Sequence, residues 1–264
     1  MTVELCRRRR LMGMWLAAGL WMAAHAIAQD KKEAIPAGPG AACQNSTFRI
    51  ALDIGHYKAK PGATSARGIT EFTYNRALAE LVLTALKASG YTSAFLIGES
   101  GDPLPLPRRS QIAREENADL FISLHHDSAQ KQYFSEWMFE GHSYPYSDKF
   151  HGYSIFVSTS SHWARESMAL ATDLGRALEA HGLTPSPHHA EAIPGEGRTL
   201  LDPALGIYRF DELAVLRGAT MPAILLESGL IVNRDEEQSI QSGTYHPKVV
   251  AALVEAITQY CNHR

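Results

Sequence analysis

Residues 50–56 read Ile-Ala-Leu-Asp-Ile-Gly-His, an almost unbroken apolar run that ends in a glycine and a histidine. The same pattern, an apolar run that ends in an ionisable residue, occurs at residues 120–125, Leu-Phe-Ile-Ser-Leu-His, and at residues 223–227, Ala-Ile-Leu-Leu-Glu. Short apolar runs of this kind are typical of strands buried on both faces of a parallel sheet. The carboxyl ends of parallel strands lie side by side at one edge of the sheet, where ligands usually bind. We therefore expect the ionisable residues that end these three runs to come together.

Apolar residues at helical spacing alternate with these runs along the chain. The pattern predicts helices at 71–89, 108–117, 165–180 and 247–260, and strands at 48–52, 93–97, 119–124, 153–157, 213–216 and 223–226. Residues 130–151 have no clear period and are expected to form an inserted loop, and residues 183–206 a long loop. Strands that alternate with helices predict a single α/β domain with a mostly parallel, twisted sheet and helices on both faces.

The first 28 residues are typical of a secretory signal peptide. Four arginines at 7–10 precede an apolar run at 11–24 and the A-x-A-like sequence at 26–28. The alternative is an uncleaved membrane anchor, but about 14 apolar residues fall short of the ~20 that a span needs. We predict a signal peptide at 1–28, a flexible lead-in at 29–46 and a catalytic domain at 47–264. The expected location is the periplasm or the cell exterior, with no stable membrane span after cleavage, and the Sec and twin-Arg routes both remain open.

Three cysteines are present, and Cys6 would leave with the signal peptide. Cys43 and Cys261 then remain at the two ends of the predicted domain. An even pair in an oxidising compartment indicates a disulfide that joins the termini, which often lie close together in a domain. The alternative is two independent thiols.

The net charge argues against a nucleic-acid partner. The whole chain has a formal charge of −3, and removal of residues 1–28, with four Arg and one Glu, makes it −6. Binding to nucleic acid calls for a basic patch, which this composition does not favour. A neutral or zwitterionic polymer remains compatible with the charge.

Two histidines and one glutamate match the donor set of a catalytic zinc site. His56 and His125 end two of the apolar runs, and Glu71 begins a predicted helix after a loop of 14 residues that follows His56. Catalytic zinc sites use three such protein ligands and leave a fourth position for water. Taken singly, each histidine is more often structural than a ligand, and Glu71 could be an ordinary first-turn acid. Strand alternation favours His125 over His126 as the ligand and places His126 toward solvent.

Glu227 ends the last apolar run with no basic neighbour in sequence. A carboxylate there would be costly to bury without a partner. Near a metal-bound water it can act as a general base. The sequence thus predicts a secreted zinc hydrolase with one Zn²⁺ held by His56, Glu71 and His125, and with Glu227 as the catalytic residue.

These motifs together resemble the zinc-dependent N-acetylmuramoyl-L-alanine amidases of bacterial cell walls. The resemblance rests on residues 52–56, on Glu71 with Asn75, on residues 122–125, and on residues 222–229 followed by Asn233. It spans about 48–258. It implies one Zn²⁺ bound by the two histidines and Glu71, and hydrolysis of the amide between N-acetylmuramic acid and L-alanine of the stem peptide. It implies peptidoglycan or a muropeptide as substrate, and an activator protein as a further partner.

Three features depart from that family's pattern. Tyr57 stands where a glycine usually follows the first histidine, and residues 131–151 are longer and richer in aromatics than the usual connection. Residues 188–198 carry many ionisable groups. That segment is interpreted as a solvated loop, as a substrate contact through Arg198, or as a plug over the zinc.

Two other functions compete with the amidase. One is a different zinc amide hydrolase, such as a deacetylase or a carboxypeptidase. The other is a cell-wall-binding protein without turnover, which the presence of all four chemical residues disfavours.

Overall fold

The computed structural model of the protein describes residue 43 and residues 46–263. The predicted signal peptide and nearly all of the predicted lead-in lie outside the described residues. Those two assignments therefore stay predictions.

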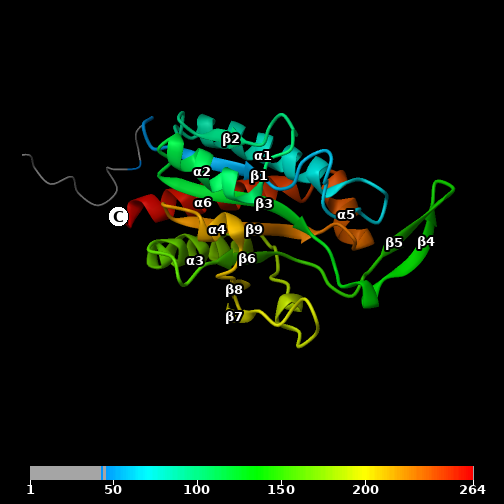
Figure 1. Cartoon of the computed structure of the whole chain (residues 1–264). Helices are drawn as coiled ribbons and strands as arrows, with labels where there is room; N and C mark the ends of the chain where they lie inside the picture. The colour runs from blue at the N-terminus through cyan, green and yellow to red at the C-terminus, as the bar shows by residue number, and fades with distance from the viewer. Residues whose placement is uncertain (1–42, 44–45, 264) are drawn as a thin grey trace, which may run out of the picture. The chain divides into compact units, whose positions relative to one another are not determined.

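A seven-stranded sheet forms the centre of the part of the chain that the structure describes, in the order β2-β1-β3-β9-β6-β8-β7 (Figure 1). Its strands are β1 (Ile50–Ile54), β2 (Phe95–Ile97), β3 (Leu120–Asp127), β6 (Ser154–Val157), β7 (Thr199–Asp202), β8 (Ile207–Arg209) and β9 (Ala223–Leu230). The pairs β1–β2, β1–β3, β3–β9 and β6–β8 are parallel, and β6–β9 and β7–β8 are antiparallel. The predicted α/β fold with a mostly parallel sheet is confirmed. The carboxyl ends of β1, β3 and β9 point to the same side of the sheet (Figure 1).

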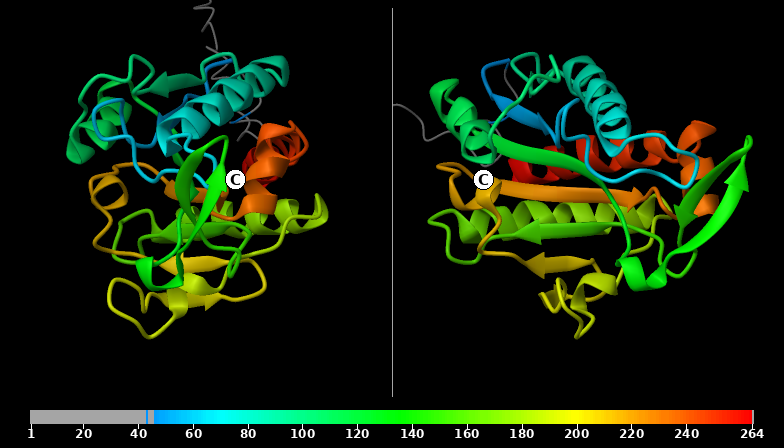
Figure 2. Two further views of the ribbon diagram at one scale, coloured as in Figure 1. Left: turned by 90° about the vertical axis from the view of Figure 1, so that its right-hand side faces the viewer. Right: turned by 45° about the vertical axis from the view of Figure 1, so that its right-hand side comes forward.

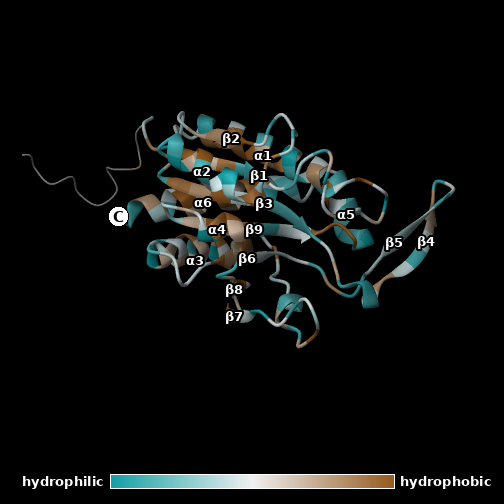
Figure 3. Ribbon diagram, in the orientation of Figure 1, coloured by the Kyte–Doolittle hydropathy of each residue, from teal (hydrophilic) through white to brown (hydrophobic). Residues whose placement is uncertain are grey.

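Helices cover both faces of the sheet, as predicted. α1 (Glu71–Ala88), α3 (Ala164–Ala180) and α6 (His246–Asn262) share a core with one face, and α2 (Leu106–Glu115) and α4 (Ala214–Arg217) share a core with the other. Strand alternation decides this division, because Ile50 and Leu52 belong to the first core and Ala51 to the second. Figure 3 shows the hydrophobic colour concentrated on the strands. Among the described helices, none is both long and apolar enough to cross a membrane.

Two predictions of secondary structure are wrong. The strand expected at 213–216 is the helical turn α4, whose Val215 and Leu216 are buried. A short apolar run does not by itself distinguish a strand from a buried helical turn. The long loop expected at 183–206 contains β7 and leads into β8, the two strands that extend the sheet beyond β6. A further helix that was not predicted, α5 (Arg234–Gln241), follows β9.

The inserted loop expected at 130–151 is instead ordered as a β-hairpin. After a 3₁₀ turn at Lys131–Tyr133, β4 (Ser135–Phe139) pairs antiparallel with β5 (His142–Tyr146) in a separate two-stranded sheet. Glu140 and Gly141 both have positive φ, of 50° and 81°. Two such residues form the type I′ turn favoured in hairpins. The hairpin projects beyond the carboxyl ends of the central strands (Figures 1 and 2).

The hairpin is fastened to the loop that precedes α1. Trp137 donates a hydrogen bond from Nε1 to the carbonyl oxygen of Ala66 at 2.6 Å. The guanidinium of Arg67 lies 5.2 Å from the Trp137 ring centre and 5.5 Å from that of Phe139, within cation–π range. The aromatic residues of the insertion therefore pack on the segment between His56 and Glu71.

Cys43 and Cys261 form the predicted disulfide. Their Cα atoms lie 5.2 Å apart, an ordinary separation for a disulfide. Both residues are fully buried in the larger core. The bond joins residue 43 to the last turn of α6, and the alternative of two independent thiols is wrong.

Candidate functional site

His56, Glu71 and His125 come together at the carboxyl ends of β1 and β3. The two oxygens of Glu71 serve different rings, because Oε2 lies 3.0 Å from His56 Nε2 and Oε1 lies 2.9 Å from His125 Nδ1. The two imidazoles meet edge to face with their centres 4.9 Å apart. Two imidazole nitrogens and a carboxylate oxygen, all within 4.8 Å of one another, form a donor set that fits a zinc ion.

Strand register and a glycine place the two histidines. Ile54 pairs with Leu124 across β1 and β3, so the residues that follow in each strand stay adjacent. A Cβ at Gly55 would lie 2.4 Å from the His125 ring, so only glycine leaves room for that imidazole. His56 itself adopts a left-handed φ of 65°, which turns the chain at the end of β1.

Glu71 is held by α1 and by the loop before it. It is the first residue of α1, and its Oε2 accepts a hydrogen bond from the backbone N–H of Ala63 at 3.0 Å. Asn75, one turn later, donates to Glu71 Oε1 at 3.1 Å and to the carbonyl oxygen of Gly55 at 3.2 Å. Burial raises the pKa of Glu71, but hydrogen bonds and charges from His125 and His56 outweigh it and bring the pKa well below its usual value. Glu71 is therefore an ionised ligand candidate.

Glu227 lies beside His125, because the two residues are register partners in β3 and β9. Its Oε2 is buried and finds no hydrogen-bond partner among the described residues. Burial raises its pKa well above the usual value, and the negative charges of Asp127 and Glu71 add to this effect, while Arg198 opposes it. Glu227 has no basic neighbour in sequence, and its positive neighbour in the fold is Arg198, which immediately precedes β7.

His126 does not face solvent, contrary to prediction. It is 1% exposed, with Nδ1 2.8 Å from Asn75 Oδ1 and Nε2 3.0 Å from Nε2 of His246. Since the Asn75 amide nitrogen already donates to Glu71, its oxygen accepts from His126 Nδ1–H, and His126 Nε2 accepts from His246. Alternation places His126 on the face covered by α1 and α6, and burial lowers its pKa well below the usual value.

A buried arginine that sequence analysis did not single out supports the end of β1. Arg109 of α2 is 1% exposed, and its Nη1 lies 2.7 Å from Asp53 Oδ1. Asp53 Oδ2 accepts a hydrogen bond from Ser123 at 2.7 Å. Arg109 also donates to the carbonyl oxygens of Ile54 and His56. One guanidinium thus fixes the backbone that presents His56.

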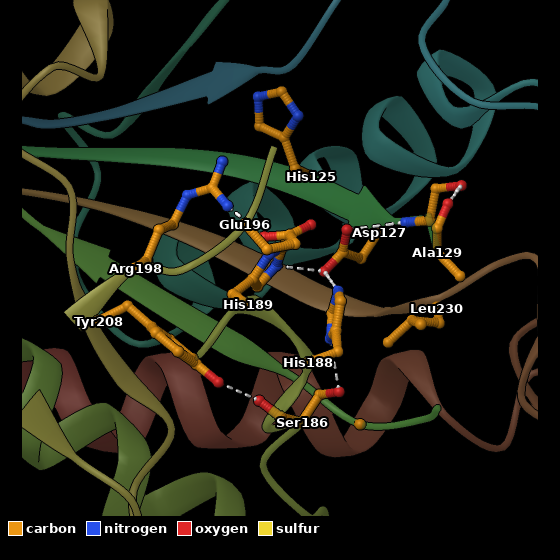
Figure 4. Close-up of polar contacts among 12 residues, drawn as sticks. His125, Asp127, Ala129, Ser186, His188, His189, Glu196, Arg198, Tyr208 and Leu230 are labelled. Carbon is orange, nitrogen blue, oxygen red and sulfur yellow. Dashed lines mark hydrogen bonds and ion pairs between the residues drawn. The ribbon is translucent and has the colours of Figure 1, made fainter. Parts of the chain in front are cut away.

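The loop at 188–198 is not a solvated loop. His188 and His189 are buried, and His189 lies between Asp127 and Glu196 (Figure 4). Arg198 forms an ion pair with Glu196, and its positive charge lowers the pKa of Glu227. This loop closes one side of the candidate site, and Asp127 is a residue of the site that sequence analysis did not single out.

Residues 50–259 match the family of N-acetylmuramoyl-L-alanine amidases. This chain belongs to that family. The protein is therefore an amidase, as the motifs predicted. It is 26% identical over 285 residues to the N-acetylmuramoyl-L-alanine amidase AmiA of Escherichia coli, with 97% of this chain and 92% of that protein covered.

Other relatives of this amidase show how far the similarity extends. The probable N-acetylmuramoyl-L-alanine amidase AmiB of Haemophilus influenzae is 24% identical over 233 residues, which cover 80% of this chain and about half, 51%, of that relative. Among solved structures, the catalytic domain of CwlV from Bacillus (Paenibacillus) polymyxa superposes with a TM-score of 0.61 at 24% identity, covering 82% of this chain and 99% of that chain. Ami1 of Mycobacterium smegmatis gives a TM-score of 0.65 at 17% identity, covering 83% and 98%. The structural matches establish the fold.

Proposed function

We propose that this amidase is a zinc-dependent hydrolase that cleaves the amide between N-acetylmuramic acid and the L-alanine of peptidoglycan stem peptides. In this proposal His56, Glu71 and His125 bind one Zn²⁺, and Glu227 is the catalytic residue. The observation that carries it is the convergence of the three ligand atoms directly beside Glu227. Family membership supports the choice of bond and of peptidoglycan or a muropeptide as substrate.

Zinc, when bound, polarises the scissile carbonyl and lowers the pKa of water. Glu227 takes the proton as water adds to the carbonyl carbon, and returns it to the nitrogen of L-alanine as the C–N bond breaks. The buried position of Glu227 suits this exchange, because burial raises its pKa and so favours uptake of the proton. Asn75 holds Glu71 in place, and Arg109 holds the backbone of His56.

We also propose that the enzyme acts outside the cytoplasm. The disulfide Cys43–Cys261 supports an oxidising compartment, since disulfides persist mainly in exported proteins. The proposed chain boundaries are a signal peptide at 1–28, a lead-in at 29–46 and the catalytic domain at 47–264. An activator protein is proposed as a further partner, and a nucleic-acid partner is not.

The test is release of soluble products from purified peptidoglycan, analysed by mass, with Glu227→Gln as the matched variant. We expect free stem peptides and peptide-free glycan from the wild type, loss of release on chelation, and recovery with Zn²⁺. Glu227→Gln should retain zinc while hydrolysis falls by about 10²-fold or more, as removal of a general base commonly does. Release of acetate would indicate a deacetylase, and release of single terminal residues a carboxypeptidase. Wild-type activity that survives complete metal removal would contradict the proposal.

A further inference from the structure

A second group of metal-ligand atoms lies at the end of β3. Asp127, His188 and His189 each offer one ligand atom, and these atoms lie within 4.8 Å of one another (Figure 4). Oδ2 of Asp127 is 3.1 Å from His188 Nε2 and 2.8 Å from His189 Nε2. We propose that these three residues bind a second metal ion, of the class that takes imidazole and carboxylate ligands, such as Zn²⁺. This site is separate from the one formed by Glu71 and its two histidines, and it does not depend on the proposed substrate.

The outer nitrogen of each ring is already engaged, which aims the inner nitrogens at Asp127. His188 Nδ1 lies 2.8 Å from Ser186 Oγ, and His189 Nδ1 lies 2.8 Å from Glu196 Oε2. Asp127 Oδ1 accepts from the backbone N–H of Ser128, so Oδ2 is the oxygen that faces both rings. Ligand histidines generally use their second nitrogen in this way, often toward a carboxylate.

The contacts of His189 favour a positive charge between its Nε2 and Asp127. Its Nδ1 faces a carboxylate and must carry hydrogen, so in the neutral ring Nε2 has only a lone pair. That lone pair would face Asp127 Oδ2 at 2.8 Å, which is repulsive unless a proton or a metal ion lies between them. Carboxylate oxygens lie 2.8 Å from both nitrogens of this ring, so the position attracts positive charge.

The position of His188 favours a metal ion over a proton at this site. Its Nε2 lies 3.1 Å from Asp127 Oδ2, yet the ring is not aligned for a hydrogen bond and the atom is buried without a hydrogen-bond partner among the described residues. The ring is 1% exposed and stacks on Phe150 with a centre distance of 5.3 Å, so it is firmly placed. A proton on His189 leaves this atom unsatisfied. One metal ion bonds to both Nε2 atoms and to Asp127 at once.

A metal ion at this site would join two segments that are distant in sequence. His188–Ala190 is a 3₁₀ turn in the loop before β7, whereas Asp127 is the last residue of β3. A metal ion would fasten this loop, with Arg198, to the sheet edge that carries His125 and Glu227. The second ion therefore shapes one wall of the active site.

The experiment is metal stoichiometry by mass spectrometry and Zn²⁺ titration on the purified mature chain, after removal of metal by chelation. The wild type is expected to bind two equivalents. His188→Ala and His189→Ala should each bind one, and His56→Ala should also bind one. His181→Ala is the control and should still bind two, because His181 lies at the end of α3, where it pairs with Glu255.

Three results would overturn the second site. The first is a wild type that binds only one equivalent, which is lost in His56→Ala. The second is a His188→Ala variant that still binds two equivalents. The third is a folded His56→Ala variant that binds no metal. The last variant leaves the second site intact, so it decides the matter even if His188→Ala does not fold. Loss of peptidoglycan hydrolysis with two metal equivalents retained would count against the proposed function and not against this site.

Discussion

Glu71 and Glu227, the two glutamates of the proposed zinc site, have different environments. Glu71 contacts two imidazoles and an amide, and its charge is stabilised. Glu227, across the strand pair from His125, has an oxygen with no such partner, and burial with two nearby negative charges disfavours its ionisation. A pair of carboxyl groups with oppositely shifted pKa values is typical of a division between a fixed charge and a proton carrier.

The two adjacent histidines of β3 should respond differently to alanine substitution. His125→Ala removes a proposed ligand, so it should bind one metal equivalent fewer. His126→Ala should retain that metal but unfold more easily, by about 1–3 kcal/mol, because Asn75 and His246 lose a buried hydrogen-bond partner. Metal titration and urea unfolding measure the two effects. Equal loss of metal in both variants would contradict the assignment of His125.

Arg109 should be essential for stability, whereas its neighbour Arg108 should not. Arg109→Met leaves Asp53 buried and unpaired and frees the carbonyl of His56, so we expect a loss of about 3–5 kcal/mol. Arg108→Met is the control, because Arg108 is 41% exposed and pairs with Glu115 at the surface, where a pair contributes ~0–1 kcal/mol. Urea unfolding compares the two variants. Similar midpoints would show that the buried pair is not needed.

At the scale of elements, the site is assembled by the order of the strands. The sheet places β1 beside β3 and β3 beside β9. In sequence, α1, β2 and α2 lie between β1 and β3, and about a hundred residues lie between β3 and β9. β3 continues to Asp127, beyond its predicted end at 124, so alternation persists long enough to place His125 and Asp127 on one face and His126 on the other. The length of β3 therefore decides which histidine reaches the proposed metal.

The contact between β3 and α6 should make the fold sensitive to acid. Burial lowers the pKa of His246 from 6.5 to about 4, so the folded protein resists protonation there while the unfolded chain does not. The resulting stability is present above pH 6.5 and is lost as the pH falls through about 4, on the order of 3 kcal/mol in all. Urea unfolding of metal-free protein between pH 7 and 4 measures it. His246→Asn should reduce this dependence and leave the part that comes from the lowered pKa of His126, and an unchanged slope would exclude His246 as a source.

The hairpin should support activity rather than suppress it. Replacing residues 135–146 by a short Gly-Ser linker should leave the seven-stranded sheet intact, because the hairpin forms its own two-stranded sheet. Peptidoglycan hydrolysis should fall several-fold, since Trp137 no longer holds the loop between His56 and Glu71. Circular dichroism and product release measure the two effects. A rise in hydrolysis would instead identify the hairpin as an autoinhibitory element.

At the scale of the whole domain, the disulfide joins the two ends of the described fold. It closes a loop with a sequence separation of 218, and cross-links typically contribute about 2–4 kcal/mol. Cys43→Ser should therefore lower the free energy of unfolding by about that amount without changing the site. Urea unfolding with and without a reducing agent tests this, and Cys43→Ser should not respond to the reductant. A wild type that is equally indifferent would show that the bond is not formed in solution.

The fold class, the buried strands and the four residues proposed for zinc chemistry could all be read from the sequence. Buried parallel strands are apolar runs bounded by glycine or a charged residue, and that signal is local. The family motifs added the expected bond and substrate. The disulfide was also predictable, because only two cysteines remain once residues 1–28 are excluded.

Only the tertiary structure decided the burial of His126, the role of Arg109, the hairpin at 135–146 and the cluster of Asp127 with His188 and His189. Each of these depends on contacts between segments distant in sequence. Asp127 and His188 are 61 positions apart in the chain, and no local pattern relates them. Periodicity shows which face of a strand a residue occupies, but the partner on that face is determined by how the whole chain packs.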